Sequence, residues 1–202
     1  MRSKIIGKCM RFIKTSNLGY TDEKLEEIQY GLESIYILIT KSFIIFLIAY
    51  LLNIWKPLLI FLIIYNLIRM PSFGLHASSS IVCLISSLII FFLGVYISIY
   101  INIPLSIRVL LGIYCIIRVY MNAPADTYKR PIINQKRRDT YKCISTLIAI
   151  IFTILSIVIP NLFMRNSFII TLCIQTLMIS PLTYKVFRVP YNNYKLYALH
   201  TV

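Results

Sequence analysis

The sequence predicts an all-α protein that crosses a membrane several times. Hydrophobic residues make up 58% of the 202 positions, charged residues only 14%, and the mean hydropathy is +0.78. Soluble domains carry about 25% charged residues, so a water-soluble globule of this length could not bury so much apolar surface. The sequence contains no ten-residue stretches of alternating polarity, and helices are then the structures that satisfy their own backbone in lipid. A soluble enzyme, a disordered chain and a secreted disulfide scaffold are therefore excluded.

The first 30 residues form a basic arm. Met1 to Asn17 intersperses five basic residues with apolar ones, which predicts an amphipathic helix lying on an anionic inner leaflet. A second helix is expected to start with Thr21 as its N-cap, because Asp22 and Glu23 then lie at the positive end of the helix dipole.

Apolar runs between residues 35 and 184 predict a bundle of about six hydrophobic helices, since about 20 helical residues cross a bilayer core of about 30 Å. The runs are Ile35–Ile54, Pro57–Ile68, Ile81–Ile103, Leu105–Tyr120, Ile144–Pro160 and Phe168–Tyr184. The second run has only 12 residues, so it fits a thin span, a tilted span or a re-entrant segment.

Basic residues give the expected orientation, because cytoplasmic loops are rich in Lys and Arg. Six crossings with both termini in the cytoplasm place 17 basic residues inside and three outside, namely Lys56, Arg108 and Arg165. Lys41 falls near the cytoplasmic end of the first span, where it can snorkel. The prediction is one membrane-embedded domain over residues 1–202, with a basic cytoplasmic loop at 122–142 and a tail at 185–202.

The segment that joins the second and third runs carries the clearest chemical signal. It contains His76, and seven residues later Cys83 enters an apolar helix. An imidazole that accepts a thiol proton is the minimal equipment for thiolate catalysis. In one straight helix these side chains would lie about 10 Å apart, so we expect His76 in a loop that contains Gly74 and folds back over the helix start. Cys83 then lies in the first turn, where the helix dipole stabilises a thiolate.

The remaining cysteines, Cys9, Cys115, Cys143 and Cys173, are interpreted as small apolar side chains. Their spacing contains no CxxC pair, so neither a disulfide framework nor a zinc site is predicted. The sequence also lacks a Gly-rich phosphate loop, and we expect no metal and no cofactor. Because the basic residues are confined to one side of the spans, they indicate a membrane surface and an acidic peptide, and no nucleic acid is expected.

Two blocks of sequence resemble the AgrB family, the membrane cysteine endopeptidases that process the quorum-sensing pro-peptide AgrD. The first block is formed by Arg69, Gly74, His76 and Cys83. The second is Ala123-Pro124-Ala125-Asp126-Thr127, followed by Lys129, Arg130, Pro131 and Ile132, which resembles the family's APADT and K-P-[IL] segment. Phe73 departs from the pattern, since many members have a small residue there, often glycine.

The resemblance implies that Cys83 is the nucleophile and His76 its general base at the cytoplasmic side of the cell membrane, with Arg69 and Gly74 supporting the site. It further implies cleavage of AgrD through an acyl-enzyme thioester, ring closure by a Cys or Ser of the substrate to a thiolactone or lactone, and a homodimer. Candidate oxyanion donors are backbone N–H groups where the Ile81 helix begins.

Several roles remain open. Arg69 could instead anchor the end of its span, Gly74 could merely supply a turn, and Asp126 could orient His76 or pair with nearby basic residues. The basic residues Lys129, Arg130, Lys136, Arg137 and Arg138 could mark topology or dock an acidic segment of the substrate. Two other classes compete with the protease. A multi-span peptide transporter without covalent chemistry would keep its activity without the Cys83 thiol, and a structural subunit would leave the His76 loop without a purpose.

Overall fold

The computed structural model describes residues 2–15, 21–75, 80–126 and 132–194. Within these ranges the regular secondary structure is helical, apart from one isolated β-bridge. The all-α prediction is therefore confirmed. The chain forms two compact units, Met1–Asn53 and Ile54–Val202.

The first unit contains two helices that contact each other, α1 (Arg2–Thr15) and α2 (Asp22–Leu51). The expected basic N-terminal helix is thus α1. Thr21 caps α2 as predicted, with its side chain accepting a hydrogen bond from the backbone N–H of Lys24 at 3.4 Å. This contact satisfies one of the N–H groups that the first turn of a helix leaves without a partner.

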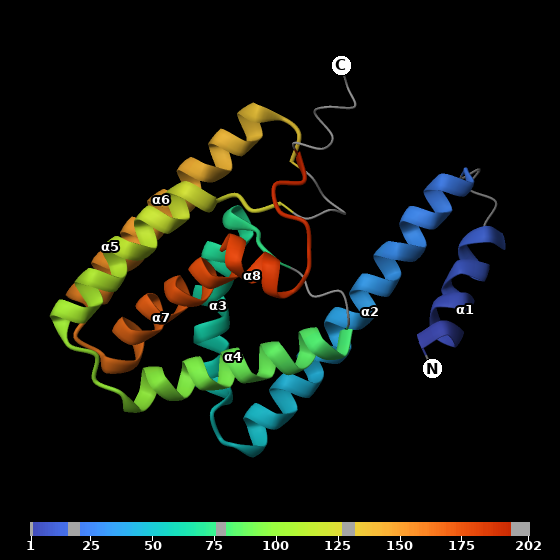
Figure 1. The fold of residues 1–202 in the computed structure, drawn as a ribbon. Helices are drawn as coiled ribbons and strands as arrows, with labels where there is room; N and C mark the ends of the chain where they lie inside the picture. Colours follow the sequence, from blue (N-terminus) through green and yellow to red (C-terminus); the bar gives the residue numbers. More distant parts are fainter. Residues whose placement is uncertain (1, 16–20, 76–79, 127–131, 195–202) are drawn as a thin grey trace. The chain divides into compact units, whose positions relative to one another are not determined.

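The second unit is a helical bundle around α7 (Leu162–Met178). This helix contacts four others, so it forms the centre of the bundle (Figure 1). Its buried face includes Phe168, Ile169 and Leu172, which belong to the main hydrophobic core. The surrounding helices are α3 (Trp55–Ser72), α4 (Ser80–Tyr100), α5 (Leu105–Asn122) and α6 (Gln135–Val158), and the short α8 (Pro181–Val186) follows α7.

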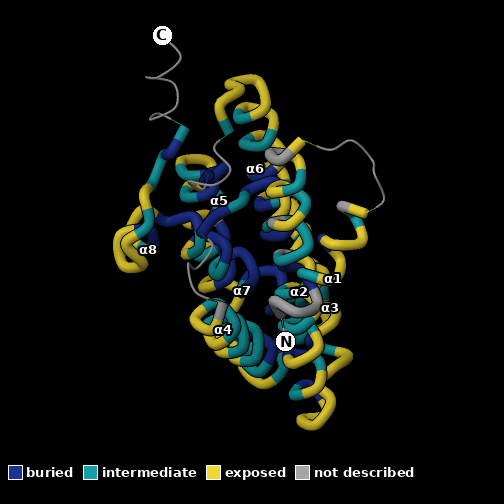
Figure 2. Tube along the Cα trace, turned by 90° about the vertical axis from the view of Figure 1, so that its right-hand side faces the viewer, coloured by how far each residue is buried: buried dark blue, intermediate teal, exposed yellow. Residues whose placement is uncertain are grey.

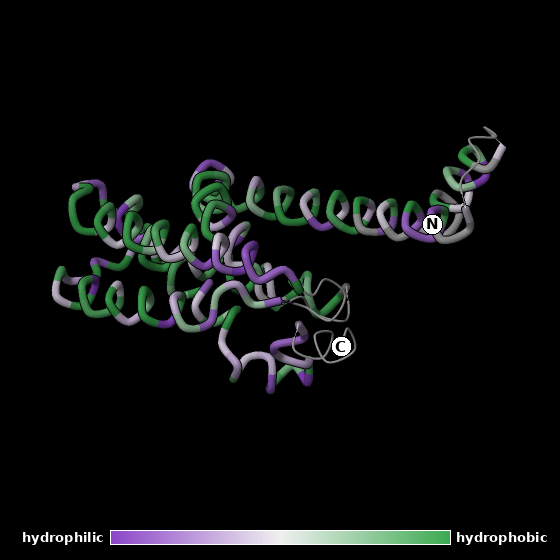
Figure 3. The backbone as a smooth tube through the Cα atoms, turned by 90° about the horizontal axis from the view of Figure 1, so that it is seen from above, coloured by the Kyte–Doolittle hydropathy of each residue, from purple (hydrophilic) through white to green (hydrophobic). Residues whose placement is uncertain are grey.

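Large apolar side chains remain exposed along the outer helices. Ile113 and Ile117 of α5 and Leu147 and Ile154 of α6 each expose about half of their surface. Figure 2 shows the buried residues gathered inside this bundle, and Figure 3 shows hydrophobic residues along most of each helix. An apolar outer surface of this extent is stable in lipid and would aggregate in water. The second unit is thus built as a membrane protein.

Four of the described helices are long and apolar enough to cross a bilayer. They cover Lys24–Leu51, Ile81–Tyr100, Leu105–Asn122 and Gln135–Val158, which makes the chain a polytopic membrane protein. The other two predicted spans fall in α3, which carries Lys56 and Arg69 near its ends, and in α7, which has 17 residues. The number of crossings and their orientation stay predictions.

One predicted boundary was wrong. The run Phe168–Tyr184 is not one helix, because α7 ends at Met178 and Ser180 caps a new helix that begins at Pro181. Proline lacks the N–H that would continue α7 and clashes with the preceding turn. Within the predicted basic loop at 122–142, residues 135–142 form the first turns of α6. Asn134 starts α6 there by accepting a hydrogen bond from the N–H of Arg137 at 3.2 Å.

Close packing of α5 on α6 depends on Gly112. A Cβ atom at this position would lie 2.3 Å from Cγ2 of Thr153. We predict that Gly112→Ala destabilises the bundle by about 1–3 kcal/mol, the usual cost of overpacking a core. A lower Tm of the purified protein in neutral detergent would report the effect.

Gly31→Ala is the matched control, because a Cβ atom at Gly31 meets nothing within 4 Å. Alanine gains up to about 1 kcal/mol over glycine in a helix interior, so this variant should be as stable as the parent or more stable. Equal losses of Tm in both variants would contradict the packing explanation.

Candidate functional site

The loop that ends α3 is held by the guanidinium of Arg69. One terminal nitrogen of Arg69 donates to the carbonyl of Phe73 at 2.5 Å, and the other donates to the carbonyls of Gly74 and Leu75 at 3.3 and 2.7 Å. Three consecutive carbonyls are thus fixed by one charged side chain. Hydrogen bonds of this charge-assisted kind are shorter and stronger than neutral ones.

The second sequence block packs directly on this loop. Phe73 and Ala125 form a parallel β-bridge, in which the N–H of Gly74 donates to the carbonyl of Ala125 at 2.9 Å. The N–H of Ala125 in turn donates to the carbonyl of Ser72 at 3.0 Å. The two blocks, which are about 50 residues apart in the sequence, therefore form one structural element.

Helix α7 completes the support from its C-terminal end. Nε2 of the fully buried Gln175 donates to the carbonyl of Phe73 at 2.8 Å, and the N–H of Leu75 donates to the carbonyl of Met178 at 3.1 Å. Gln175 was not among the predicted site residues. A glutamine inside an apolar run is a weak signal, and only the fold shows which backbone group it meets.

Gly74 has a conformation and a position that require glycine. Its φ is +118°, and a Cβ atom would lie 2.3 Å from a terminal nitrogen of Arg69 and 3.0 Å from the carbonyl oxygen of Met178. A side chain would therefore displace the guanidinium that fixes the loop. The structure therefore shows Gly74 in a turn, and its support of a catalytic site stays a prediction.

Phe73 also has a positive φ, at +55° with ψ at −136°. Glycine adopts such a conformation readily, whereas other residues pay about 1–3 kcal/mol. The ring of Phe73 packs edge-on against Tyr141 of α6, with 5.1 Å between the ring centroids. The departure of this chain from the family pattern thus combines a strained backbone with an aromatic contact.

Asp126 is buried and binds the C-terminal segment. Its two carboxylate oxygens accept hydrogen bonds from the N–H groups of Asn193 and Tyr194 at 3.1 and 2.7 Å. Arg138 lies 4.0 Å from the same carboxylate, and its guanidinium stacks 3.4 Å above the ring of Tyr194. The described partners of Asp126 are therefore a basic residue, as one of the two interpretations proposed, and the tail.

Tyr184 connects this cluster to the loop that ends α3, residues 72–75, which we call the Gly74 loop. Its side chain is fully buried, and its hydroxyl lies 3.1 Å from the carbonyl oxygen of Asp126, to which it donates. Burial raises the pKa of Tyr184 above its ordinary value, although the positive charge of Arg69 acts in the opposite direction. The phenol donates this hydrogen bond from a buried position. No pattern in the sequence distinguishes Tyr184 from the other 14 tyrosines.

Cys83 lies in the first turn of α4, as the sequence predicted. Its thiol is free and half-buried, and it is close enough to Tyr65 of α3 to interact with it electrostatically. Ser87 donates to the carbonyl of Cys83 at 2.7 Å, one turn further along. His76 and the loop residues Lys129 and Arg130 lie outside the described residues, so the predicted contact between His76 and Cys83 stays a prediction.

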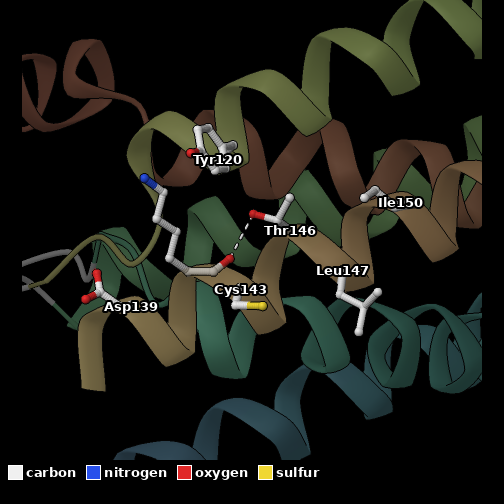
Figure 4. Close-up of a pocket in the computed structure, with 7 residues that line it drawn as sticks. Tyr120, Asp139, Cys143, Thr146, Leu147 and Ile150 are labelled. Atoms are coloured by element: carbon white, nitrogen blue, oxygen red, sulfur yellow. Dashed lines mark hydrogen bonds between the residues drawn. The ribbon is translucent and has the colours of Figure 1, made fainter. Parts of the chain in front are cut away.

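A separate pocket of about 470 Å³ lies between α5 and α6 (Figure 4). The ammonium group of Lys142 lies 4.1 Å from the centroid of the Tyr120 ring. The lining also includes Asp139, Cys143 and Leu147, and none of the predicted catalytic residues. Among the described residues, no group of three His, Cys, Asp or Glu side chains is placed to hold a metal ion.

These features define a polytopic helical membrane protein in which a braced loop leads to a cysteine at the start of a helix. A family model described as accessory gene regulator B matches residues 6–179, and the chain therefore belongs to the AgrB family. This family acts in accessory gene regulation, a form of quorum sensing.

Individual relatives agree with this assignment. The chain is 32% identical over 171 residues to a putative AgrB-like protein of Clostridium acetobutylicum, covering 85% of this chain and 82% of that protein. It is 32% identical over 178 residues to a putative AgrB-like protein of Listeria monocytogenes, covering 87% and 86%. The accessory gene regulator protein B of Staphylococcus aureus is 34% identical over 127 residues, covering 60% and 67%. No solved structure matches the chain.

The geometry of the loop predicts different effects on stability for two neighbouring substitutions. Gly74→Ala should destabilise the protein by about 1–3 kcal/mol, because the Cβ atom enters the space of the Arg69 guanidinium. Phe73→Gly removes strain of similar size to the aromatic contact that it loses, so its stability should stay within about 1 kcal/mol of the parent. Thermal unfolding in detergent checks both values.

Phe73→Ala is the matched control for the second substitution. It loses the contact with Tyr141 and keeps the unfavourable φ, so it should be less stable than Phe73→Gly. If alanine and glycine at position 73 gave the same Tm, the positive φ would not be a source of strain.

Proposed function

We propose that the protein is a membrane cysteine endopeptidase that cleaves an AgrD-type pro-peptide and promotes cyclisation of the product. The observation that carries the proposal is the position of Cys83, whose thiol lies in the first turn of α4. The positive end of a helix dipole favours negative charge that develops near it. Family membership supports the same role.

The residues that immediately precede His76 are held by hydrogen bonds. The last three residues before it, Phe73, Gly74 and Leu75, have their carbonyls bound by Arg69, and their backbone is anchored to Ala125 and Met178. A catalytic base needs a position defined within a fraction of an ångström. Arg69 and Gly74 are therefore proposed as positioning residues, which do not touch the substrate.

The proposed reaction is balanced without a cofactor. His76 accepts the proton of Cys83, and the thiolate attacks the scissile carbonyl carbon of the peptide. The C–N bond breaks, the leaving amine takes the proton from His76, and the N-terminal fragment remains as a thioester on Cys83. His76 then accepts the proton of a substrate thiol or hydroxyl, which attacks this thioester and closes the ring. The C–S bond to Cys83 breaks, and the Cys83 thiolate takes the proton back from His76. Exchange of one thioester for another is nearly neutral in free energy because sulfur replaces sulfur.

Cys83→Ala and His76→Ala are predicted to abolish cleavage while the protein still reaches the membrane. Loss of the nucleophile removes the covalent step, and loss of the base costs about 10²- to 10⁴-fold. Co-expression with a candidate pro-peptide and immunoblotting for the cleaved fragment would measure both. Cys143→Ala is the control, because Cys143 is an exposed thiol on α6 outside the proposed site.

The alternative function is a peptide transporter that uses no covalent chemistry, which several apolar helices also suit. In that case Cys83→Ser would retain activity, and no acyl adduct would form on Cys83. Mass spectrometry of the protein after incubation with pro-peptide distinguishes the two functions. Full cleavage by Cys83→Ala would rule out the endopeptidase proposal.

An acidic segment of the pro-peptide is proposed to dock on the basic residues at 129–138, on the cytoplasmic side. Lys136 and Arg137 are exposed on the first turn of α6, whereas Arg138 is half-buried against Asp126 and Tyr194. Among the described residues, the side chain of Arg138 thus contacts Asp126 and Tyr194, whereas those of Lys136 and Arg137 are exposed. A homodimer and an anionic inner leaflet complete the proposed assembly.

Neutralising Lys136 and Arg137 should raise the KM for the pro-peptide several-fold and leave kcat and Tm unchanged, because exposed charges mainly steer a charged partner. Arg138→Gln, by contrast, should lower Tm through loss of its contacts with Asp126 and Tyr194. Unchanged cleavage kinetics after neutralisation of Lys129, Arg130, Lys136 and Arg137 together would rule out docking by charge.

A further inference from the structure

Two arginines lie together at the end of the bundle opposite the Gly74 loop. Arg108 is the fourth residue of α5 and Arg165 the fourth residue of α7, so each lies in the first turn of its helix. Figure 1 shows the turns that precede these helices, α4–α5 and α6–α7, at the same end of the bundle. Arg165 bridges the two turns by donating to Oδ1 of Asn102 at 2.7 Å.

Both guanidinium groups are held by neutral partners. Nε of Arg108 donates to the carbonyl of Ile103 at 3.1 Å, and a terminal nitrogen donates to the carbonyl of Ser156. Only 6% of the surface of Arg108 is exposed. Nε of Arg165 is buried and makes no hydrogen bond within the described residues. Each guanidinium has five N–H donors, so donors remain for a further acceptor.

The charges of this pair are not neutralised by the unit that contains them. Arg108 and Arg165 carry like charges and bind the adjacent residues Ile103 and Asn102, and each lies in the first turn of a helix, at the positive end of its dipole. The acidic residues between positions 54 and 202 are Asp126 and Asp139, and both lie toward the other end of the bundle. A buried charge without an opposite charge is costly, so this arrangement favours binding of an anion.

The surroundings of the pair are apolar and exposed. Ile101, Leu105, Ile107 and Val158 flank the arginines in the sequence or on the adjoining helix ends, and they expose between 46% and 69% of their surface. Such a rim lies at the boundary between hydrocarbon and headgroups when helices of this kind cross a bilayer. An anion that also carries acyl chains would satisfy both the guanidinium groups and the rim.

We propose that Arg108 and Arg165 bind the phosphate group of an anionic phospholipid at this end of the bundle. The planar guanidinium forks match the phosphate oxygens, and the helix N-termini of α5 and α7 add to the positive potential. The lipid would bridge the α4–α5 and α6–α7 turns, which Arg165 and Asn166 already connect through Asn102, Ser98 and Ile101. It would thereby stabilise the packing of α7, the central helix.

The test uses the full-length protein in neutral detergent with added short-chain phosphatidylglycerol. Native mass spectrometry should show retention of phosphatidylglycerol in preference to phosphatidylcholine, and Tm should rise with the phosphatidylglycerol concentration. Arg165→Gln should weaken the apparent affinity by about tenfold, the effect of losing one charge-assisted contact. Arg165→Lys, which keeps the charge, should retain more of the affinity than Arg165→Gln.

Lys56→Gln is the matched control, because Lys56 is an exposed cation near the start of α3, at the same end of the bundle. It should bind phosphatidylglycerol as the parent does. Equal weakening by Lys56→Gln and Arg165→Gln would reduce the effect to general surface charge and overturn the proposal. So would a lack of preference for phosphatidylglycerol in the parent protein, which stays decisive even if Arg165→Gln does not fold. If inorganic phosphate alone raised Tm as much as phosphatidylglycerol does, the ligand of the two arginines would be a free anion, and the phospholipid proposal would be wrong.

Discussion

The guanidinium of Arg69 binds the carbonyl oxygens of Phe73, Gly74 and Leu75, and the structure around the candidate site depends on this interaction. Three carbonyls that turn away from the end of α3 cannot be satisfied by helical hydrogen bonds. In a bundle with an apolar exterior, an unsatisfied carbonyl costs several kcal/mol. A single side chain with five donors removes that cost and fixes the direction in which the chain leaves α3.

The same loop joins parts of the chain that are distant in sequence. Ala125 pairs with the loop through a β-bridge, and Gln175 and Met178 of α7 form hydrogen bonds with it. The hydroxyl of Tyr184 donates a hydrogen bond to the carbonyl of Asp126. The tail then closes over Asp126 through the N–H groups of Asn193 and Tyr194. These polar contacts lie at one end of an otherwise apolar bundle. The contacts therefore fix the backbone of residues 72–75 and of Ala125 and Asp126.

The arginines at the two ends of the bundle have different kinds of partner. Near the Gly74 loop, Arg69 is bound by carbonyls and Arg138 has a carboxylate 4.0 Å away, in Asp126. Asp126 and Asp139, the acidic residues of this unit, lie toward the Gly74 loop, so Arg108 and Arg165 at the opposite end have no acidic partner in the same unit. The first arrangement fixes the loop through contacts within the chain. The second calls for an external anion, and the apolar rim around it identifies a phospholipid as the occupant that fits.

The sequence by itself determined the helical fold, the membrane environment, the family and the place of Cys83 in the first turn of its helix. Hydropathy, capping residues and local motifs carry that information, because each depends on residues close together in the chain. Tertiary structure decided that Gln175 and Tyr184 support the loop, that Asp126 binds the tail and that Phe73 takes a positive φ. The hydrogen bonds among them join residues that are 58 to 102 positions apart, and local patterns do not record which buried donor meets which acceptor.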